Sequence, residues 1–152
     1  MSSVIDAGLS LVGLARGIAQ NRARWRSAVR FDPEQRYYAL LAQTPEYEVW
    51  LLTWVPGQST GIHDHGQASG AFTVVQGKLQ ESVYSAARAE RTFERGRVRA
   101  FGPAHIHDLG NAGPAPAVSI HVYSPRLTTM TRYDVNDGRL VVASVEHAGA
   151  DW

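Results

Sequence analysis

Cysteine is absent from this chain of 152 residues. Its absence excludes a disulfide framework, a thiolate zinc site, an iron–sulfur cluster and a cysteine nucleophile. Long hydrophobic runs are absent too, since no stretch approaches the roughly 18 to 20 uninterrupted apolar residues that a membrane helix requires. Any metal that this chain binds must therefore be held by histidine and carboxylate side chains.

A large excess of one charge sign is also missing. The chain has 15 lysine and arginine residues against 14 aspartate and glutamate residues, a net charge of +1, and Lys78 is its only lysine. Proteins that coat nucleic acid or anionic lipid need a much larger positive charge. We therefore expect neither nucleic acid nor a membrane as a partner. The N-terminal segment lacks a basic leader and includes Asp6, so the expected location is the cytoplasm.

The chain does contain enough apolar residues for one globular core. Hydrophobic residues make up 44% and charged residues 19% of the sequence, and this length fits a single domain. Apolar residues recur at helical spacing from Val4 to Ile18, which predicts an N-terminal helix. A second helix is predicted from Asp32 to about Thr44, because Asp32 suits the N-cap and Pro33 the first helical position.

Beyond the second predicted helix, the pattern changes to short runs rich in β-branched and aromatic residues. Turn signals such as Pro56-Gly57 and Asn136-Asp137-Gly138 separate these runs. The runs predict strands over residues 47–55, 72–76, 79–85, 98–101, 118–123, 130–135 and 140–145. Short strands at close spacing are typical of a β-sandwich or a small barrel. We therefore expect one domain over residues 1–152, with two helices in about 1–45 packing on a β-barrel in about 46–146.

Histidines concentrate in segments with strand character. Five of the six lie there: His63, His65, His105, His107 and His121. Side chains at positions i and i+2 of a strand point to the same face, with Cα atoms about 6 to 7 Å apart, so His63 and His65 form one pair and His105 and His107 another. Polar residues repeated inside a small barrel are costly without partners. The arrangement therefore predicts a metal site with imidazole ligands.

Other polar residues accompany these histidines. Three of them alternate with apolar residues on one predicted strand and should face the interior: Ser119, His121 and Tyr123. They form either a functional relay or a satisfied polar ladder. Asp64 and Asp108 are offset by one residue from the histidine pairs, so they should face away, in supporting or surface positions. His147 lies in a polar tail, and no metal role is predicted for it.

The spacing of glycines and histidines resembles the two metal-binding signatures of the cupin superfamily. The first is carried by Gly57, His63, Asp64, His65, Gly70 and Gly77, and the second by Gly96, Pro103, His107 and Asn111. The resemblance implies a mostly β cupin fold, a double-stranded β-helix or jelly-roll barrel, here with two N-terminal α-helices. Gly70 stands where the signature usually has a glutamate ligand. Pro103 is one residue nearer His107 than usual, so His105 remains a competitor, although the spacing to Asn111 favours His107.

More specifically, residues 54–84 and 101–133 resemble cysteine dioxygenase, with Gly61–His65 as the first block and Ser119–Pro125 as the last. The resemblance implies a mononuclear Fe(II) held by the metal ligands His63, His65 and His107, and a catalytic relay of Ser119, His121 and Tyr123. It also implies that both atoms of O₂ are added to the sulfur of a small carboxylated thiol, with L-cysteine as the first candidate. The alternatives are 3-mercaptopropionate as substrate and a non-catalytic metal-binding cupin. A monomer or weak homo-oligomer is expected.

Two positions depart from the cysteine dioxygenase pattern. Animal members have a cysteine at the position of Gly70 that cross-links to the tyrosine, so Tyr123 must here be a free phenol. Cysteine-specific members bind the substrate carboxylate with an arginine where this chain has Ala39. Arg132 is the candidate replacement, and a surface ion pair with Asp134 or Glu146 is the alternative role for it.

Overall fold

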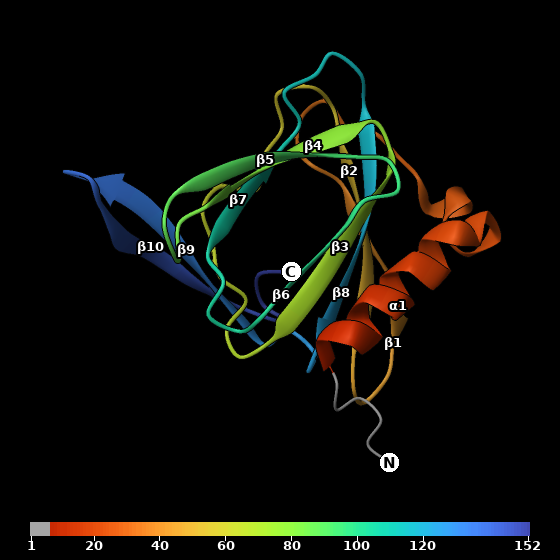
Figure 1. The fold of residues 1–152 in the computed structure, drawn as a ribbon, viewed down its shortest axis with the longest axis horizontal. Helices are drawn as coiled ribbons and strands as arrows, with labels where there is room; N and C mark the ends of the chain where they lie inside the picture. Colours follow the sequence, from red (N-terminus) through yellow and green to blue (C-terminus); the bar gives the residue numbers. More distant parts are fainter. Residues whose placement is uncertain (1–6) are drawn as a thin grey trace.

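The computed structural model describes residues 7–152 and consists of one α-helix, two short 3₁₀ turns and ten strands (Figure 1). Helix α1 covers Ala7–Gln20, and the 3₁₀ turns cover Arg22–Arg24 and Arg26–Ala28. The first five strands are β1 (Tyr38–Gln43), β2 (Glu48–Trp54), β3 (Ser69–Gln76), β4 (Lys78–Val83) and β5 (Ala89–Glu94). The others are β6 (Val98–Phe101), β7 (His107–Gly110), β8 (Ala117–Ser124), β9 (Thr129–Asn136) and β10 (Arg139–His147).

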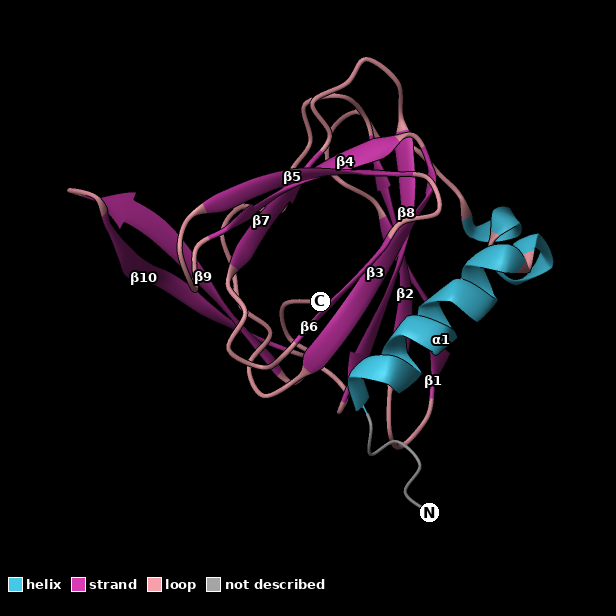
Figure 2. Ribbon diagram, in the orientation of Figure 1, coloured by secondary structure: helices cyan, strands magenta, loops and turns pink. Residues whose placement is uncertain are grey.

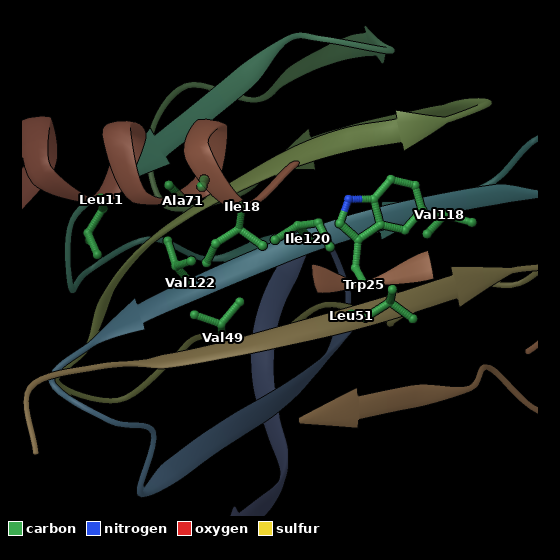
Figure 3. Packing of buried hydrophobic residues seen from close by; sticks show 10 residues of the cluster. Leu11, Ile18, Trp25, Val49, Leu51, Ala71, Val118, Ile120 and Val122 are labelled. Atoms are coloured by element: carbon green, nitrogen blue, oxygen red, sulfur yellow. The ribbon is translucent and has the colours of Figure 1, made fainter. Parts of the chain in front are cut away.

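The predicted N-terminal helix is confirmed over Ala7–Gln20, and its predicted start at Val4 lies outside the described residues. Leu11, Ala15 and Ile18 recur at helical spacing and are all buried. They pack on apolar residues of β2, β3 and β8 (Figure 3). Figure 2 shows this helix outside the ring of strands. One face of the central sheet is therefore covered by α1, and the other face is left for the barrel interior.

The central sheet has five strands in the order β1-β2-β8-β3-β6, and a second sheet has the order β5-β4-β7. Strand β8 is buried along nearly its whole length. Because side chains alternate between the faces of a strand, Val118, Ile120 and Val122 face α1. His121 and Tyr123, at the alternate positions of this strand, therefore point to the barrel interior, where both line a pocket. The strand alternation predicted for this segment is confirmed.

The predicted second helix is wrong. Residues 38–43 form strand β1, which pairs antiparallel with β2 and places Tyr38 opposite Leu52. Asp32 does accept a hydrogen bond from a backbone amide, that of Glu34 at 2.8 Å, but it closes a local turn and caps no helix. Pairing with β2 overrides the local helix signals, as tertiary context often does. The strands therefore begin at Tyr38, earlier than the expected boundary near residue 46.

Strands β9 and β10 form a hairpin that extends away from the ring of strands (Figure 1). Only its base contacts the histidine segment. The backbone amide of Asp64 donates to the carbonyl of Thr131 at 2.9 Å, and that of Tyr133 donates to the carbonyl of Ile62 at 3.0 Å. Seven strands lie close to their predicted ranges, and β7 begins in the segment of His105 and His107, for which strand character is expected without a range. Strands β1 and β5 are not predicted by the sequence. Within residues 7–152, no helix is long and apolar enough to cross a membrane.

Candidate metal centre

Three histidines from two separate segments meet inside the barrel. His63 and His65 lie in the loop between β2 and β3, and His107 is the first residue of β7. One ring nitrogen of each lies within 4.8 Å of those of the other two, and all three side chains are buried. Two backbone hydrogen bonds join His63 to His107, at 2.9 and 3.0 Å, and so fix their spacing. The structure thus brings together the three residues expected as metal ligands.

In two of these histidines, a hydrogen bond at one ring nitrogen determines which nitrogen is left to bind a metal ion. The Nδ1 atom of His63 lies 2.9 Å from the carbonyl oxygen of Gly61. The Nδ1 atom of His107 lies 2.7 Å from the carboxylate of Glu81. In each case the oxygen is an acceptor, so Nδ1 carries the proton and donates. The Nε2 atoms are left with lone pairs for a metal ion, as in most histidine metal sites.

His65 supports the same conclusion by a different observation. It is 1% exposed, and neither of its ring nitrogens has a hydrogen-bond partner among the described residues. A buried polar group without a partner is unusual in a folded protein. A bound metal ion would supply the missing partner. Burial, together with the charges of the other histidines, lowers the pKa of His63 and of His65 well below the usual range. The rings are therefore neutral, which is the form that binds a metal.

Glu81 of β4 joins two histidines and an arginine. Its Oε2 atom accepts from His107 and from His105, at 2.7 and 2.9 Å, and its Oε1 atom accepts from Arg99 at 2.9 Å. Burial would raise the pKa of Glu81, but the hydrogen bonds from the two histidines and the charge of Arg99 lower it to about 2. Glu81 is therefore a carboxylate. The sequence analysis did not identify Glu81 as a site residue. The signal that could have done so is its place at an inward position of the predicted strand over residues 79–85.

His105 does not join the group of His63, His65 and His107. It belongs instead to a second group of possible ligands with Glu81 and His107. Because hydrogen bonds to both histidines already occupy this carboxylate, the second group is a network that supports His107. The spacing argument that favoured His107 over its competitor agrees with this arrangement.

The expected relay is formed in part. Ser119 Oγ lies 2.7 Å from Nε2 of His121 and accepts a hydrogen bond from the indole of Trp54 at 2.9 Å. Burial lowers the pKa of His121 to about 3, so its ring is neutral. Among residues 7–152, no hydrogen bond connects His121 to Tyr123. Burial raises the pKa of Tyr123 despite the nearby charge of Arg36, so its phenol stays protonated and can donate to a ligand.

A pocket of about 370 Å³ opens onto the histidines, a volume that suits a small ligand. The side chains of His63, His107, His121 and Tyr123 line its inner end. Its remaining polar lining includes Gln35, Arg36, Thr60, Arg132, Glu146 and Asp151. The pocket thus places two cations and two carboxylates near the possible metal ligands.

The two arginines of the pocket differ in their partners. Arg132 pairs with Glu146 at 2.9 Å and also donates to the carbonyl of Thr60 at 2.6 Å, so its guanidinium is engaged by the protein. Arg36 forms no ion pair with any described residue, and its buried Nε atom has no partner. It lies over Trp54, with Cζ 5.3 Å from the ring centroid. Sequence reasoning missed Arg36 because the segment was expected to be helical.

The remaining polar residues take structural positions. Asp64 accepts from the amide of Thr131 at 3.0 Å and from the hydroxyl of Tyr133 at 2.9 Å, so it ties the loop of His63 and His65 to β9. Asp108 lies within hydrogen-bond distance of Thr60. His147 is exposed at the end of β10 and belongs to no ligand group.

Comparison with known proteins identifies the family of this chain. The family profile of cysteine dioxygenase type I matches residues 4–136. The chain belongs to this family. Cysteine dioxygenase type 1 of Rattus norvegicus is 26% identical over 130 residues, which cover 78% of this chain and 65% of the relative. That of Danio rerio is 23% identical over 139 residues, which cover 82% and 69%. The chain thus spans about two thirds of the length of these curated relatives.

Solved structures support the fold alone. A protein from Thermus thermophilus has a TM-score of 0.61 at 21% identity, and the match covers 66% of this chain and 93% of that one. A protein with a double-stranded β-helix domain from Klebsiella pneumoniae has a TM-score of 0.59 at 18% identity, with coverage of 78% and 93%. A cupin superfamily protein from Desulfitobacterium hafniense has a TM-score of 0.58 at 13% identity, with coverage of 66% and 87%. The predicted cupin fold is confirmed.

Proposed function

We propose that this protein is an Fe(II)-dependent thiol dioxygenase that adds both atoms of O₂ to the sulfur of a small carboxylated thiol. The observation that carries the proposal is the geometry of one pocket. Two of the three grouped histidines, His63 and His107, line this pocket, and Arg36, which forms no ion pair with any described residue, lines it as well. Membership of the cysteine dioxygenase family supports the reaction class. L-cysteine is the first candidate substrate, and 3-mercaptopropionate is the alternative.

Each pocket residue has a part in this reaction. Fe(II), bound by His63, His65 and His107, would supply a centre for a thiolate and O₂. Arg36 binds the substrate carboxylate, because a guanidinium that forms no ion pair with any described residue gains most from a charged hydrogen bond. Tyr123 donates a hydrogen bond from its phenol toward the reacting groups. The carboxylate of Asp151 also lines the pocket and suits an ammonium group, which favours cysteine over its deaminated analogue, whereas Glu146 is already paired with Arg132.

Oxygen uptake by the iron-loaded protein tests the proposal. We expect consumption of O₂ with L-cysteine or 3-mercaptopropionate and formation of the corresponding sulfinate. The panel should include cysteamine, which lacks a carboxylate, and L-serine, which lacks the sulfur. If iron binds and no thiol increases O₂ uptake, the protein is instead a non-catalytic metal-binding cupin.

Tyr123→Phe should lower turnover and leave the metal in place. The substitution removes the phenol but keeps the ring that stacks with His65 at a centroid distance of 5.4 Å. Loss of a side chain that donates a proton or hydrogen bond to the reacting groups typically lowers the rate about 10²-fold or more. Iron content and turnover measured on the same sample check this. Turnover equal to that of the wild type would mean that the phenol takes no part in the reaction.

Arg132→Ala distinguishes the two arginines. Because Arg132 already pairs with Glu146 and with the carbonyl of Thr60, we expect a smaller rise in KM for a carboxylated thiol than Arg36→Ala produces. The Michaelis constants of both variants, measured with one substrate at the same iron content, check this. If Arg132→Ala produces the larger rise, Arg132 is the carboxylate ligand, as the sequence suggested.

A further inference from the structure

His65 lacks the support that the other two candidate ligands have. His63 and His107 each donate from Nδ1 to an oxygen atom, whereas neither nitrogen of His65 has a partner. Aromatic rings contact it instead. Phe101 stacks with it at a centroid distance of 4.7 Å and an interplanar angle of 30°, and Tyr123 does so at 5.4 Å and 28°. These contacts are the means by which the fold orients the His65 ring.

The ring of Phe101 occupies space that exists only because residue 70 is glycine. Gly70 of β3 lies opposite Phe101 of β6 on one side and Tyr123 of β8 on the other. A Cβ atom at position 70 would lie 2.6 Å from Cζ of Phe101 and 3.0 Å from Cδ1 of Tyr123. Such distances are well inside ordinary carbon contacts of about 3.5 to 4.0 Å. Any side chain at this position therefore requires Phe101 to move.

Phe101 is itself held by a second stacking contact. It stacks with His105 at a centroid distance of 4.6 Å and an angle of 18°. His105 in turn is held by its hydrogen bond to Glu81 at 2.9 Å. The ring of Phe101 thus links His65 to the hydrogen-bond network that orients His107.

We propose that Phe101 is a positioning residue that fixes the ring of His65 by stacking, in place of the hydrogen bond that orients the other two ligands. Gly70 provides the space for this ring. The proposal rests on the proposed function in one respect, that His65 is a metal ligand. Histidine ligands usually donate from their second nitrogen to a fixed acceptor, so a ligand oriented by aromatic contact alone should depend strongly on that contact.

Binding of Co²⁺ to the metal-free protein tests the role of Phe101. Phe101→Leu keeps an apolar side chain but removes the stacking ring, and we expect the affinity for Co²⁺ to fall about tenfold, as is usual when a supporting residue is lost. The visible absorption of bound Co²⁺, which reports ligand geometry, should change as well. Phe93→Leu is the matched control, because Phe93 is another phenylalanine of the barrel and packs edge-on against Phe72 at 5.3 Å, away from the group of three histidines. It should lower thermal stability and leave Co²⁺ affinity unchanged.

Gly70→Ala tests the space argument. In the wild-type background it should also weaken Co²⁺ binding, because the new methyl group displaces Phe101. In the Phe101→Leu background its effect should be much smaller, since the displaced ring is already absent. Coupled residues give such non-additive effects, whereas independent ones add.

The outcomes separate this inference from the proposed function. If Phe101→Leu binds Co²⁺ with the affinity and spectrum of the wild type, the positioning role is wrong. If the wild type itself binds no Co²⁺, the three-histidine site and the role of Phe101 are both wrong. A protein whose Co²⁺ affinity depends on Phe101 but that, when iron-loaded, takes up no O₂ with any thiol supports the positioning role and contradicts the dioxygenase.

Discussion

His107→Ala should abolish stable metal binding and, with it, any thiol-dependent O₂ uptake. The substitution removes one of the three buried candidate ligands, whose ring nitrogens lie within 4.8 Å of one another. It also leaves the carboxylate of Glu81 with one histidine partner fewer. Loss of a supporting residue already costs about 10- to 100-fold in metal affinity, so loss of a ligand should cost at least about 100-fold. Iron content after anaerobic loading and desalting measures this directly.

The control for this variant is His147→Ala. His147 is exposed at the end of β10 and belongs to no group of possible ligands, so its loss should leave iron content and O₂ uptake unchanged. Thermal unfolding of both metal-free variants shows whether each is folded. A folded His107→Ala protein that retains a full equivalent of iron would mean that the metal is bound elsewhere in the chain.

Arg36→Ala should raise the KM for a carboxylated thiol more than any other pocket substitution that leaves the metal bound. Arg36 lines the pocket, its Nε atom is buried without a partner, and no described carboxylate neutralises its charge. Burial and the nearby charge of Arg132 lower the pKa of Arg36, which shows that the protein alone does not stabilise this cation. Hydrogen bonds to charged groups are worth about 1.5 to 3 kcal/mol, or roughly 10- to 150-fold in kcat/KM.

A thiol without a carboxylate separates binding from general damage to the site. Cysteamine has no carboxylate for Arg36 to bind. The low activity expected with cysteamine should therefore be the same for Arg36→Ala and the wild type. Arg126→Ala, at an exposed position after β8, is a matched control that should leave both substrates unaffected. Equal losses for cysteine and cysteamine in Arg36→Ala would contradict a carboxylate-binding role and indicate a change in the pocket as a whole.

Local patterns were sufficient for seven of the ten described strands and for the inward direction of the β8 histidine. The alternation in the β8 segment predicted which side chains face inward, because a strand has a fixed two-residue period. The same local reasoning failed for residues 32–44, where Asp32 and Pro33 are good helix-start signals but the backbone pairs with β2 instead. Pairing partners lie far away in sequence, so a local propensity cannot show whether such a pairing exists.

The search for a carboxylate-binding arginine also needed the tertiary structure. The resemblance to cysteine-specific members led to Ala39 and then to Arg132 as a replacement, whereas Arg36 is the pocket arginine that forms no ion pair with any described residue. Its direction depends on the turn that precedes β1 and on the contact with Trp54. Neither can be read from residue types along a single segment.

The sequence by itself determined the chemistry that is available. Without cysteine, the ligands had to be histidine or carboxylate, and the order of the histidine motifs predicted His63, His65 and His107 as the candidates. The tertiary structure decided what contacts each candidate ligand: the Gly61 carbonyl contacts His63, Glu81 contacts His107, and Phe101, in the space that Gly70 leaves, stacks with His65. Residue types fix which atoms can bind, whereas orientation depends on contacts between segments that only the folded chain brings together.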